Sequence, residues 1–142
     1  MLVRCLYASR PAASLSPQQI DLILEQSRRN NPRAGITGIL CYTQDVFVQV
    51  IEGGRDEVCR LFNGIVRDDR HVDVRILVYE EISERRFSNW TMGKVDLSKL
   101  NAGLMLKYFK NANLDPFDAP GHATMALMHE LVANAVIVSR GV

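Results

Sequence analysis

The sequence has little charge imbalance, few cysteines and no long apolar run. Its 17 basic and 16 acidic residues give a formal net charge of +1, which provides no general attraction to nucleic acid or to an anionic membrane. Cys5, Cys41 and Cys59 lie far apart without a C-x-x-C motif, which is typical of reduced thiols in a cytosol-like compartment. No apolar run approaches membrane-spanning length, and the start, MLVRCLYASR, lacks the apolar core of a signal peptide. We therefore expect a cytoplasmic protein that binds neither nucleic acid nor a membrane.

Sequence patterns for metal binding, nucleophilic catalysis and phosphate-binding loops are also lacking. His71, His122 and His129 are scattered, and no spacing of cysteines, histidines or carboxylates resembles a metal site. No serine or cysteine lies in a nucleophile elbow, and the glycines of GITG and EGG match no phosphate-binding motif. These absences disfavour all three kinds of chemistry, and we expect no bound metal.

The first hundred residues do contain a clear alternation of strand and helix patterns. Strand patterns cover the stretches LVRCLYAS, GITGILCYT, VFVQVIE, VDVRILVYE and WTMGKV. A helix is expected to begin after Ser16, which starts a capping box, and to end at Asn31-Pro32, because the residue before a proline avoids the helical region. A second helix is expected over 55–69. The order βαββαββ predicts an α+β, ferredoxin-like fold with a five-stranded mixed sheet and two helices on one face.

Beyond residue 97 the pattern changes to short helices, which we expect over 101–110 and 121–139. The second of these has an apolar stripe, which consists of Met125, Met128, Val132, Ala135 and Val136. Because two earlier helices already cover one face of the sheet, this extension can cover the other face or bind a partner. We expect residues 1–97 to form one domain and residues 98–142 to form a helical extension.

Polar side chains on the helix-covered face of the sheet are the strongest candidates for a binding site. Tyr7 and Gln49 lie among apolar neighbours on strands that this topology places close together, and Asn30-Asn31 ends the first helix at the edge of the same region. Taken singly, each has an ordinary structural explanation, such as a core tyrosine with a satisfied hydroxyl. Together, one phenol and up to three amides suit a flat heterocycle with carbonyls and ring nitrogens. None titrates near neutral pH, so acid–base catalysis is disfavoured.

Several motifs, in order along the chain, closely resemble those of BLUF domains, which are FAD-binding blue-light photoreceptors. The matching stretches are LYAS, NNPRAGITGILCY, FVQVIEG, IVRDDRH and RRFSNWTM, and they cover about residues 2–97. The remaining residues are similar to the C-terminal helical extension of short members of that family. The resemblance implies a light sensor rather than an enzyme. It also implies a non-covalent FAD cofactor, for which FMN or riboflavin are possible substitutes.

The resemblance implies roles for particular residues. Tyr7 matches the tyrosine that gives an electron and then a proton to the excited flavin, and Gln49 matches the glutamine that bridges this tyrosine and the flavin ring. Asn31 matches the residue bonded to the carbonyl and imide edge of the flavin, and Asn30 lies beside it. The other implied residues are Ser9, Trp90 and Met92 around the glutamine, Ile23 and Ile65 in the walls of the ring pocket, and Asp68, Arg70 and His71 near the ribityl and phosphate end.

Gly64 departs from the family pattern, because some relatives carry an arginine just before the isoleucine of the second helix. Arg29 and Arg70 are therefore both candidates for the basic residue that steadies the FAD phosphates.

The mechanism that the resemblance implies is a reversible switch. Electron and proton transfer from Tyr7 would leave Gln49 rotated or tautomerised, with an added hydrogen bond to the flavin C4 carbonyl and a red-shifted absorption. Rearrangement around Met92 and Trp90 would bias the C-terminal helices and signal to a partner protein. Relatives of this length form dimers or larger rings, so we expect a homo-oligomer. Two alternatives stay open: a ferredoxin-like flavin-dependent oxidoreductase, and a non-photoactive ligand-binding or interaction domain.

Overall fold

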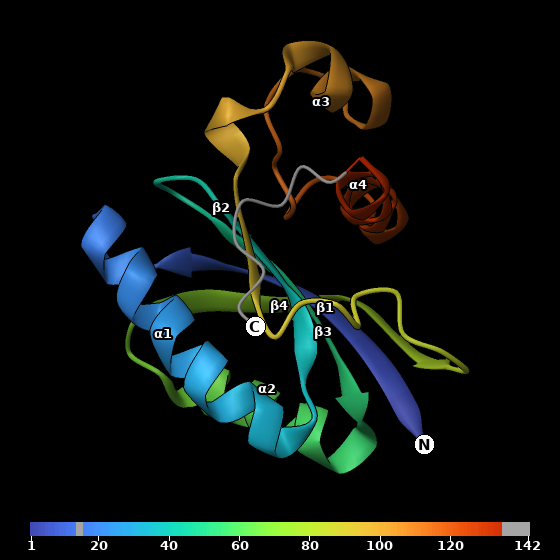
Figure 1. Ribbon diagram of the computed structural model, residues 1–142. Coiled ribbons are helices and arrows are strands. Elements are labelled where there is room, and N and C mark those ends of the chain that lie inside the picture. Colours follow the sequence, from blue (N-terminus) through green and yellow to red (C-terminus); the bar gives the residue numbers. More distant parts are fainter. Residues whose placement is uncertain (14–15, 135–142) are drawn as a thin grey trace.

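Helices cover both faces of a single five-stranded sheet in the computed structural model, which describes residues 1–13 and 16–134 (Figure 1). The strands are β1 (Leu2–Pro11), β2 (Thr37–Tyr42), β3 (Phe47–Gly54), β4 (His71–Ile82) and β5 (Gly93–Asp96). The helices are α1 (Pro17–Ala34), α2 (Arg55–Arg67), α3 (Ala102–Tyr108) and α4 (Gly121–Ala133), with a 3-10 turn, η1 (Leu97–Lys99). In Figure 1, α1 and α2 lie below the sheet and α3 and α4 lie above it.

The sheet has the order β4-β1-β3-β2-β5, which confirms the predicted ferredoxin-like α+β fold. β1 runs antiparallel to both β3 and β4, and β2 and β3 form the predicted antiparallel hairpin. β5 lies at the edge and runs parallel to β2, so the sheet is mixed. β1 lies between β4 and β3, and its register with β3 places Tyr7 directly opposite Gln49, which confirms that these residues are neighbours.

Helix α1 begins as predicted but ends later. The side chain of Ser16 accepts a hydrogen bond from the backbone of Gln19, whose side chain accepts one from Ser16 in return, so the capping box is present. The expected end at Asn31-Pro32 is wrong, because the helix continues to Ala34 with Pro32 in its last turn. The stop is instead Gly35, whose left-handed backbone (φ 67°) lets its N–H reach the last carbonyls of the helix.

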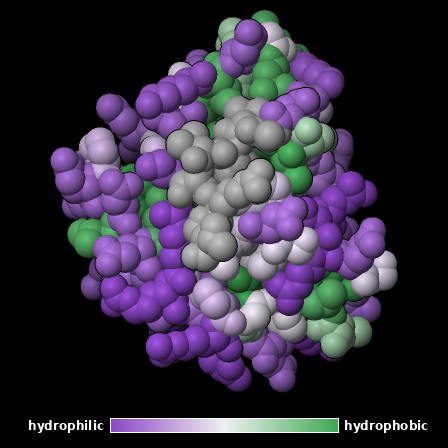
Figure 2. Space-filling view, viewed as in Figure 1, coloured by the Kyte–Doolittle hydropathy of each residue, from purple (hydrophilic) through white to green (hydrophobic). Residues whose placement is uncertain are grey.

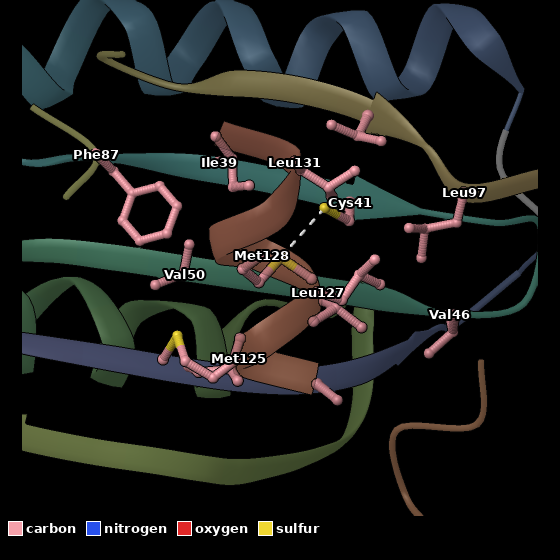
Figure 3. Close-up of a cluster of buried hydrophobic side chains, with 14 of the residues drawn as sticks. Ile39, Cys41, Val46, Val50, Phe87, Leu97, Met125, Leu127, Met128 and Leu131 are labelled. Carbon is pink, nitrogen blue, oxygen red and sulfur yellow. Dashed lines mark hydrogen bonds between the residues drawn. The ribbon is translucent and has the colours of Figure 1, made fainter. Parts of the chain in front are cut away.

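Two apolar cores lie on opposite faces of the sheet. Helix α1 contributes Ile20 and Leu24 to the lower core, and most of the visible surface around α1 is hydrophilic (Figure 2). On the upper face, α4 packs against the sheet, and the sulfur of Met128 lies 3.5 Å from the sulfur of Cys41 on β2 (Figure 3). Of the two possibilities for the C-terminal extension, the structure therefore shows the first, a cover for the second face. The buried residues that α4 contributes are Thr124, Met125, Leu127, Met128 and Leu131.

The described part of α4 ends at Ala133, so the expected continuation to residue 139 lies outside the described residues, as do Ala135 and Val136. Its first residue, Gly121, packs directly on the backbone of β4. A Cβ atom added at Gly121 would lie 2.5 Å from the carbonyl oxygen of Leu77. Only a glycine therefore allows α4 to begin this close to the sheet.

A buried ion pair beneath the C-terminal helices was not predicted from the sequence. Arg4 of β1 lies opposite Glu52 of β3, and its Nε donates to Glu52 Oε2 at 2.8 Å. The same carboxylate accepts the backbone N–H groups of Arg86 (3.0 Å) and Phe87 (2.7 Å). Arg4 also pairs with the half-exposed Glu80 at 2.8 Å. These contacts fix the loop between β4 and β5 to the centre of the sheet.

None of the helices in residues 16–134 combines the length and hydrophobicity that a membrane crossing requires.

Candidate functional site

A cavity of about 260 Å³ opens between α1, α2 and the lower face of the sheet. This volume is close to the lower end of the range for small-molecule sites. Both helices and four strands, β1 to β4, contribute to its walls. The lining residues are Tyr7, Ile23, Gln26, Ser27, Asn30, Asn31, Leu40, Phe47, Gln49, Arg60, Leu61, Gly64, Ile65, Asp68, Arg70 and His71.

A chain of hydrogen bonds crosses the inner wall of this cavity through Gln49. The hydroxyl of Tyr7 donates to Gln49 Oε1, and Gln49 Nε2 donates to the sulfur of Met92 at 3.2 Å. All three side chains are buried. Burial raises the pKa of Tyr7 far above its usual value, so the phenol stays protonated at physiological pH. The amide of Gln49 therefore has one partner at each end, a strong donor and a weak thioether acceptor.

The end of α1 holds the segment that precedes β5. Asn31 Nδ2 donates to the carbonyl oxygen of Thr91 at 2.8 Å, and Arg28 donates to the carbonyl oxygen of Met92 at 3.4 Å. Trp90 lies in the upper core with the buried residues of α4, whereas Met92 lies in the lower core beside the cavity. Two residues of one short segment thus belong to the two different cores, and the segment connects them.

Polar side chains gather at the end of the cavity near His71. Ser9 Oγ lies 2.8 Å from His71 Nδ1, and the His71 ring packs 5.0 Å from the ring of Phe47. Burial lowers the pKa of His71, so the imidazole is neutral near pH 7. Asp68 accepts bidentate hydrogen bonds from Arg70, which lower the pKa of its carboxyl group. This end of the cavity therefore contains one neutral imidazole and one neutralised ion pair.

The structure brings most of the residues named from the sequence to one place. Ile23 and Ile65 line the cavity from α1 and α2, and Asn30 and Asn31 line it from the end of α1. Met92 contacts Gln49 but Trp90 does not lie on this face, and Ser9 bonds to His71 at the outer end.

Arg29 lies outside the lining and pairs with Glu25 at 3.1 Å on the exposed side of α1.

Sequence reasoning missed three polar lining residues: Gln26, Ser27 and Arg60. Helical spacing provides a signal for all three. Gln26 lies four residues before Asn30, Ser27 lies four residues after Ile23, and Arg60 lies four residues before Gly64. Each therefore shares a helix face with a residue that lines the cavity.

The lining fits a flavin and gives no support to a metal site. Buried amides and a phenol supply neutral donors and acceptors, and isoleucines on two opposing helices supply flat apolar walls. No group of three or more histidine, cysteine, aspartate or glutamate side chains within residues 1–13 and 16–134 is arranged to hold a metal ion. The arrangement can bind a planar heterocycle through its polar edge.

Fold and site together define a domain with a ferredoxin-like sheet and a cavity suited to a planar ligand. Residues 2–93 match the BLUF family, described as "Sensors of blue-light using FAD", and the chain belongs to this family. It is thus a blue-light sensor that uses a flavin, and its Tyr7–Gln49 hydrogen bond is consistent with the hydrogen-bond network of BLUF domains. BLUF domains are themselves sensors without catalytic activity.

Solved structures of similar proteins match along nearly the whole chain. The BLUF protein BlrB in its dark state is 35% identical, with a TM-score of 0.79 over 94% of this chain and 96% of BlrB. The photo-activated state of BlsA is 29% identical, with a TM-score of 0.80 over 93% of this chain and 95% of BlsA.

A much longer protein also contains a similar segment. The photoactivated adenylate cyclase subunit beta of Euglena longa is 33% identical over 87 residues, which are 61% of this chain and only 10% of the cyclase subunit. The chain therefore spans a small part of that relative's length.

Proposed function

We propose that this chain holds FAD non-covalently as a light-absorbing cofactor and passes a light-dependent signal to another protein, without catalysing a reaction itself. The family description supports FAD, and the neutral amides and apolar walls of the cavity suit the flavin ring. Because FMN and riboflavin share that ring, they are expected substitutes. The buried free thiols of Cys5 and Cys41 support a cytoplasmic location.

The observation that carries the proposal is the two-ended hydrogen bonding of Gln49. A bound flavin supplies the absorption of blue light and an excited state that accepts an electron. Tyr7 transiently gives up an electron and its phenolic proton and then regains both, so the protein undergoes no net oxidation. Because burial keeps the Tyr7 phenol protonated, it loses its proton only when it is oxidised. During this cycle the side-chain amide of Gln49 turns over, so that Oε1 and Nε2 exchange places. The turn is possible because the hydrogen bond from Nε2 to the Met92 sulfur is weak.

The signal leaves through the segment that connects the two cores. Reorientation of Gln49 alters the contact with Met92, and Met92 is only two residues from Trp90 in the upper core. Trp90 belongs to the same cluster as Leu127 and Met128 of α4. A shift of this segment therefore biases α4 between two arrangements, which a downstream signalling protein distinguishes.

We also propose self-association, as a dimer or a larger ring. Met125 and Met128 of α4 are buried against the sheet and are not available for it. Exposed apolar side chains instead follow the edge strand β4, where Val72 and Ile76 are 43% and 53% exposed, and Val66 of α2 lies nearby. An uncovered apolar edge of this kind favours pairing with another copy. Light scattering on the dark and lit protein tests this, and a monomer in both states would contradict it.

The visible absorption spectrum before and after blue light tests the central proposal. We expect a reversible red shift without bleaching, which Tyr7→Phe abolishes although flavin remains bound. Tyr42→Phe is the matched control, because Tyr42 is a half-buried tyrosine of the same sheet outside the cavity, and it should keep the shift. Lasting bleaching with reductant, a colourless protein in excess FAD, or a persistent shift in Tyr7→Phe would each contradict the proposal.

A further inference from the structure

The two arginines that line the cavity differ in what else they bind. Arg70 donates to both oxygens of Asp68, at 3.0 and 2.6 Å, and to Gln26 at 3.2 Å. An anion that recruits Arg70 would have to compete with these bonds. The side chain of Arg60 on α2 forms no hydrogen bond or ion pair with any residue in the described ranges 1–13 and 16–134, although it lines the same cavity. Of the two arginines that line the cavity, Arg60 is therefore the one whose guanidinium is not paired with a carboxylate.

The surface of α2 beside Arg60 is open. Gly64 lies one helical turn after Arg60, so the two residues share one face of the helix. A Cβ atom added at Gly64 would meet nothing within 4 Å. The absence of a side chain at Gly64 thus leaves room next to the guanidinium of Arg60, along the wall of the cavity.

The nearby charges permit an anion in this space. Asp68 is the acidic residue of the lining, and the bidentate contact with Arg70 neutralises its carboxylate. A guanidinium without a partner is the group that best matches a phosphate, because it offers two parallel N–H donors. The other candidate, Arg29, is outside the lining and is paired with Glu25.

We propose that Arg60 binds the phosphate of the flavin nucleotide and that Gly64 leaves the room which this phosphate occupies. Arg60 thereby acts as a specificity residue that distinguishes flavin nucleotides from riboflavin, whereas Arg70 serves to neutralise Asp68. The inference rests on the proposed flavin site, since the phosphate arrives attached to the ring.

Comparison of three flavins tests the role of Arg60. The full chain is loaded with riboflavin, FMN or FAD, and the dissociation constant is measured from flavin fluorescence on dilution. Arg60→Gln should weaken FMN and FAD binding about fivefold, the effect of an exposed charge pair, and leave riboflavin binding unchanged. The loss should shrink as salt is added. Arg29→Gln is the matched control and should change none of the three constants.

A second variant tests the room at Gly64. Gly64→Leu places an uncharged side chain in the open space beside Arg60. It should weaken FMN and FAD binding and leave riboflavin binding unchanged, because the side chain occupies the place of the phosphate. Equal losses for all three flavins in Arg60→Gln, or a phosphate-dependent loss in Arg70→Gln alone, would overturn the proposal. Failure of riboflavin to bind the original chain would instead refute the flavin site itself.

Discussion

Gln49 is a buried neutral amide whose two ends face partners of very different strength. A phenol that cannot ionise at physiological pH donates to Oε1, and a thioether accepts from Nε2. The cost of burying the amide is therefore offset at both ends, but only one of the bonds is strong. An amide held in this way has a preferred orientation and a nearby alternative, which is what a switch needs.

Glu52 illustrates the opposite case, a buried polar residue that is fixed. It is fully buried and accepts hydrogen bonds from Arg4, from Arg86 and from Phe87. Replacement by glutamine removes the charge that compensates Arg4 and presents an amide N–H₂ to backbone donors. We expect Glu52→Gln to lower the free energy of unfolding by about 3 kcal/mol, measured by urea denaturation.

The neighbouring carboxylate provides the control for this prediction. Glu80 bonds to the same arginine, but its side chain is 44% exposed. Glu80→Gln should therefore cost less than about 1 kcal/mol. Equal losses in the two variants would show that Glu52 does not serve as the internal counter-charge.

Two half-buried histidines make the stability depend on pH. Burial lowers the pKa of both His71 and His129, so the folded protein resists protonation at a pH where the unfolded chain, with pKa values near about 6.5, accepts protons. The free energy of unfolding should therefore fall as the pH drops below about 6.5 towards the folded pKa values.

Urea denaturation at about pH 7.5 and about pH 5.5 measures this dependence. In the double variant His71→Gln/His129→Gln, the free energy of unfolding should change less between these two pH values. The difference is up to about 1.4 kcal/mol per histidine for each pH unit. His122→Gln, at an exposed position on α4, should leave the pH dependence unchanged. An unaltered slope in the double variant would refute the assignment.

The sequence was sufficient to predict that Tyr7 and Gln49 are neighbours, because strand alternation and strand order follow regular rules. Tyr7 and Gln49 face one side of their strands, and a ferredoxin-like order puts those strands together. The ion pair of Arg4 and Glu52 escaped prediction because it depends on register, which alternation alone does not provide. The place of Arg60 in the cavity wall was not predicted, because most exposed arginines on helices face only solvent. The structure of the cavity is needed to distinguish Arg60 from these.

Among the helices, α4 contributes most to the upper core. Leu127 is fully buried in it, beside Met128 and Leu131 (Figure 3). We expect Leu127→Ala to lower the free energy of unfolding by about 3 kcal/mol, because it leaves a cavity that a packed core fills only in part. Leu106→Ala on α3, where the side chain is 55% exposed, is the matched control and should cost less than about 0.5 kcal/mol. Thermal or urea unfolding measures both, and equal effects would contradict the packing assigned to α4.

The boundaries of elements were predicted less well than their existence. The pattern WTMGKV predicted a strand from residue 90, but β5 begins at Gly93. The two residues Trp90 and Met92 would share a face in an extended strand, yet they lie in different cores because this segment is irregular. The end of α1 was also predicted wrongly, because Pro32 was expected to stop the helix. The last helical turn tolerates this proline, and the helix ends at Gly35, which forms the cap.

The sheet depends on the C-terminal helices to cover its upper face. The prediction that residues 1–97 form a domain can be tested with a chain that stops at residue 97. Its upper face would expose Leu6, Ile39 and Val50, which are fully buried in the whole chain. We expect low soluble yield and aggregation, because large exposed apolar patches associate. A monomeric fragment with the unfolding midpoint of the whole chain would contradict this and would establish the first 97 residues as an independent unit.

The placement of Trp90 has a practical consequence, because it is the single tryptophan of the chain. Its indole lies in the core beneath α4, on the face of the sheet away from the flavin cavity, while the backbone next to it is held by Asn31 at the cavity. Tryptophan emission is therefore a built-in optical reporter for the far side of the sheet. A change in that emission after blue light, in the unlabelled protein, would register arrival of the signal at α4 separately from the colour change at the flavin.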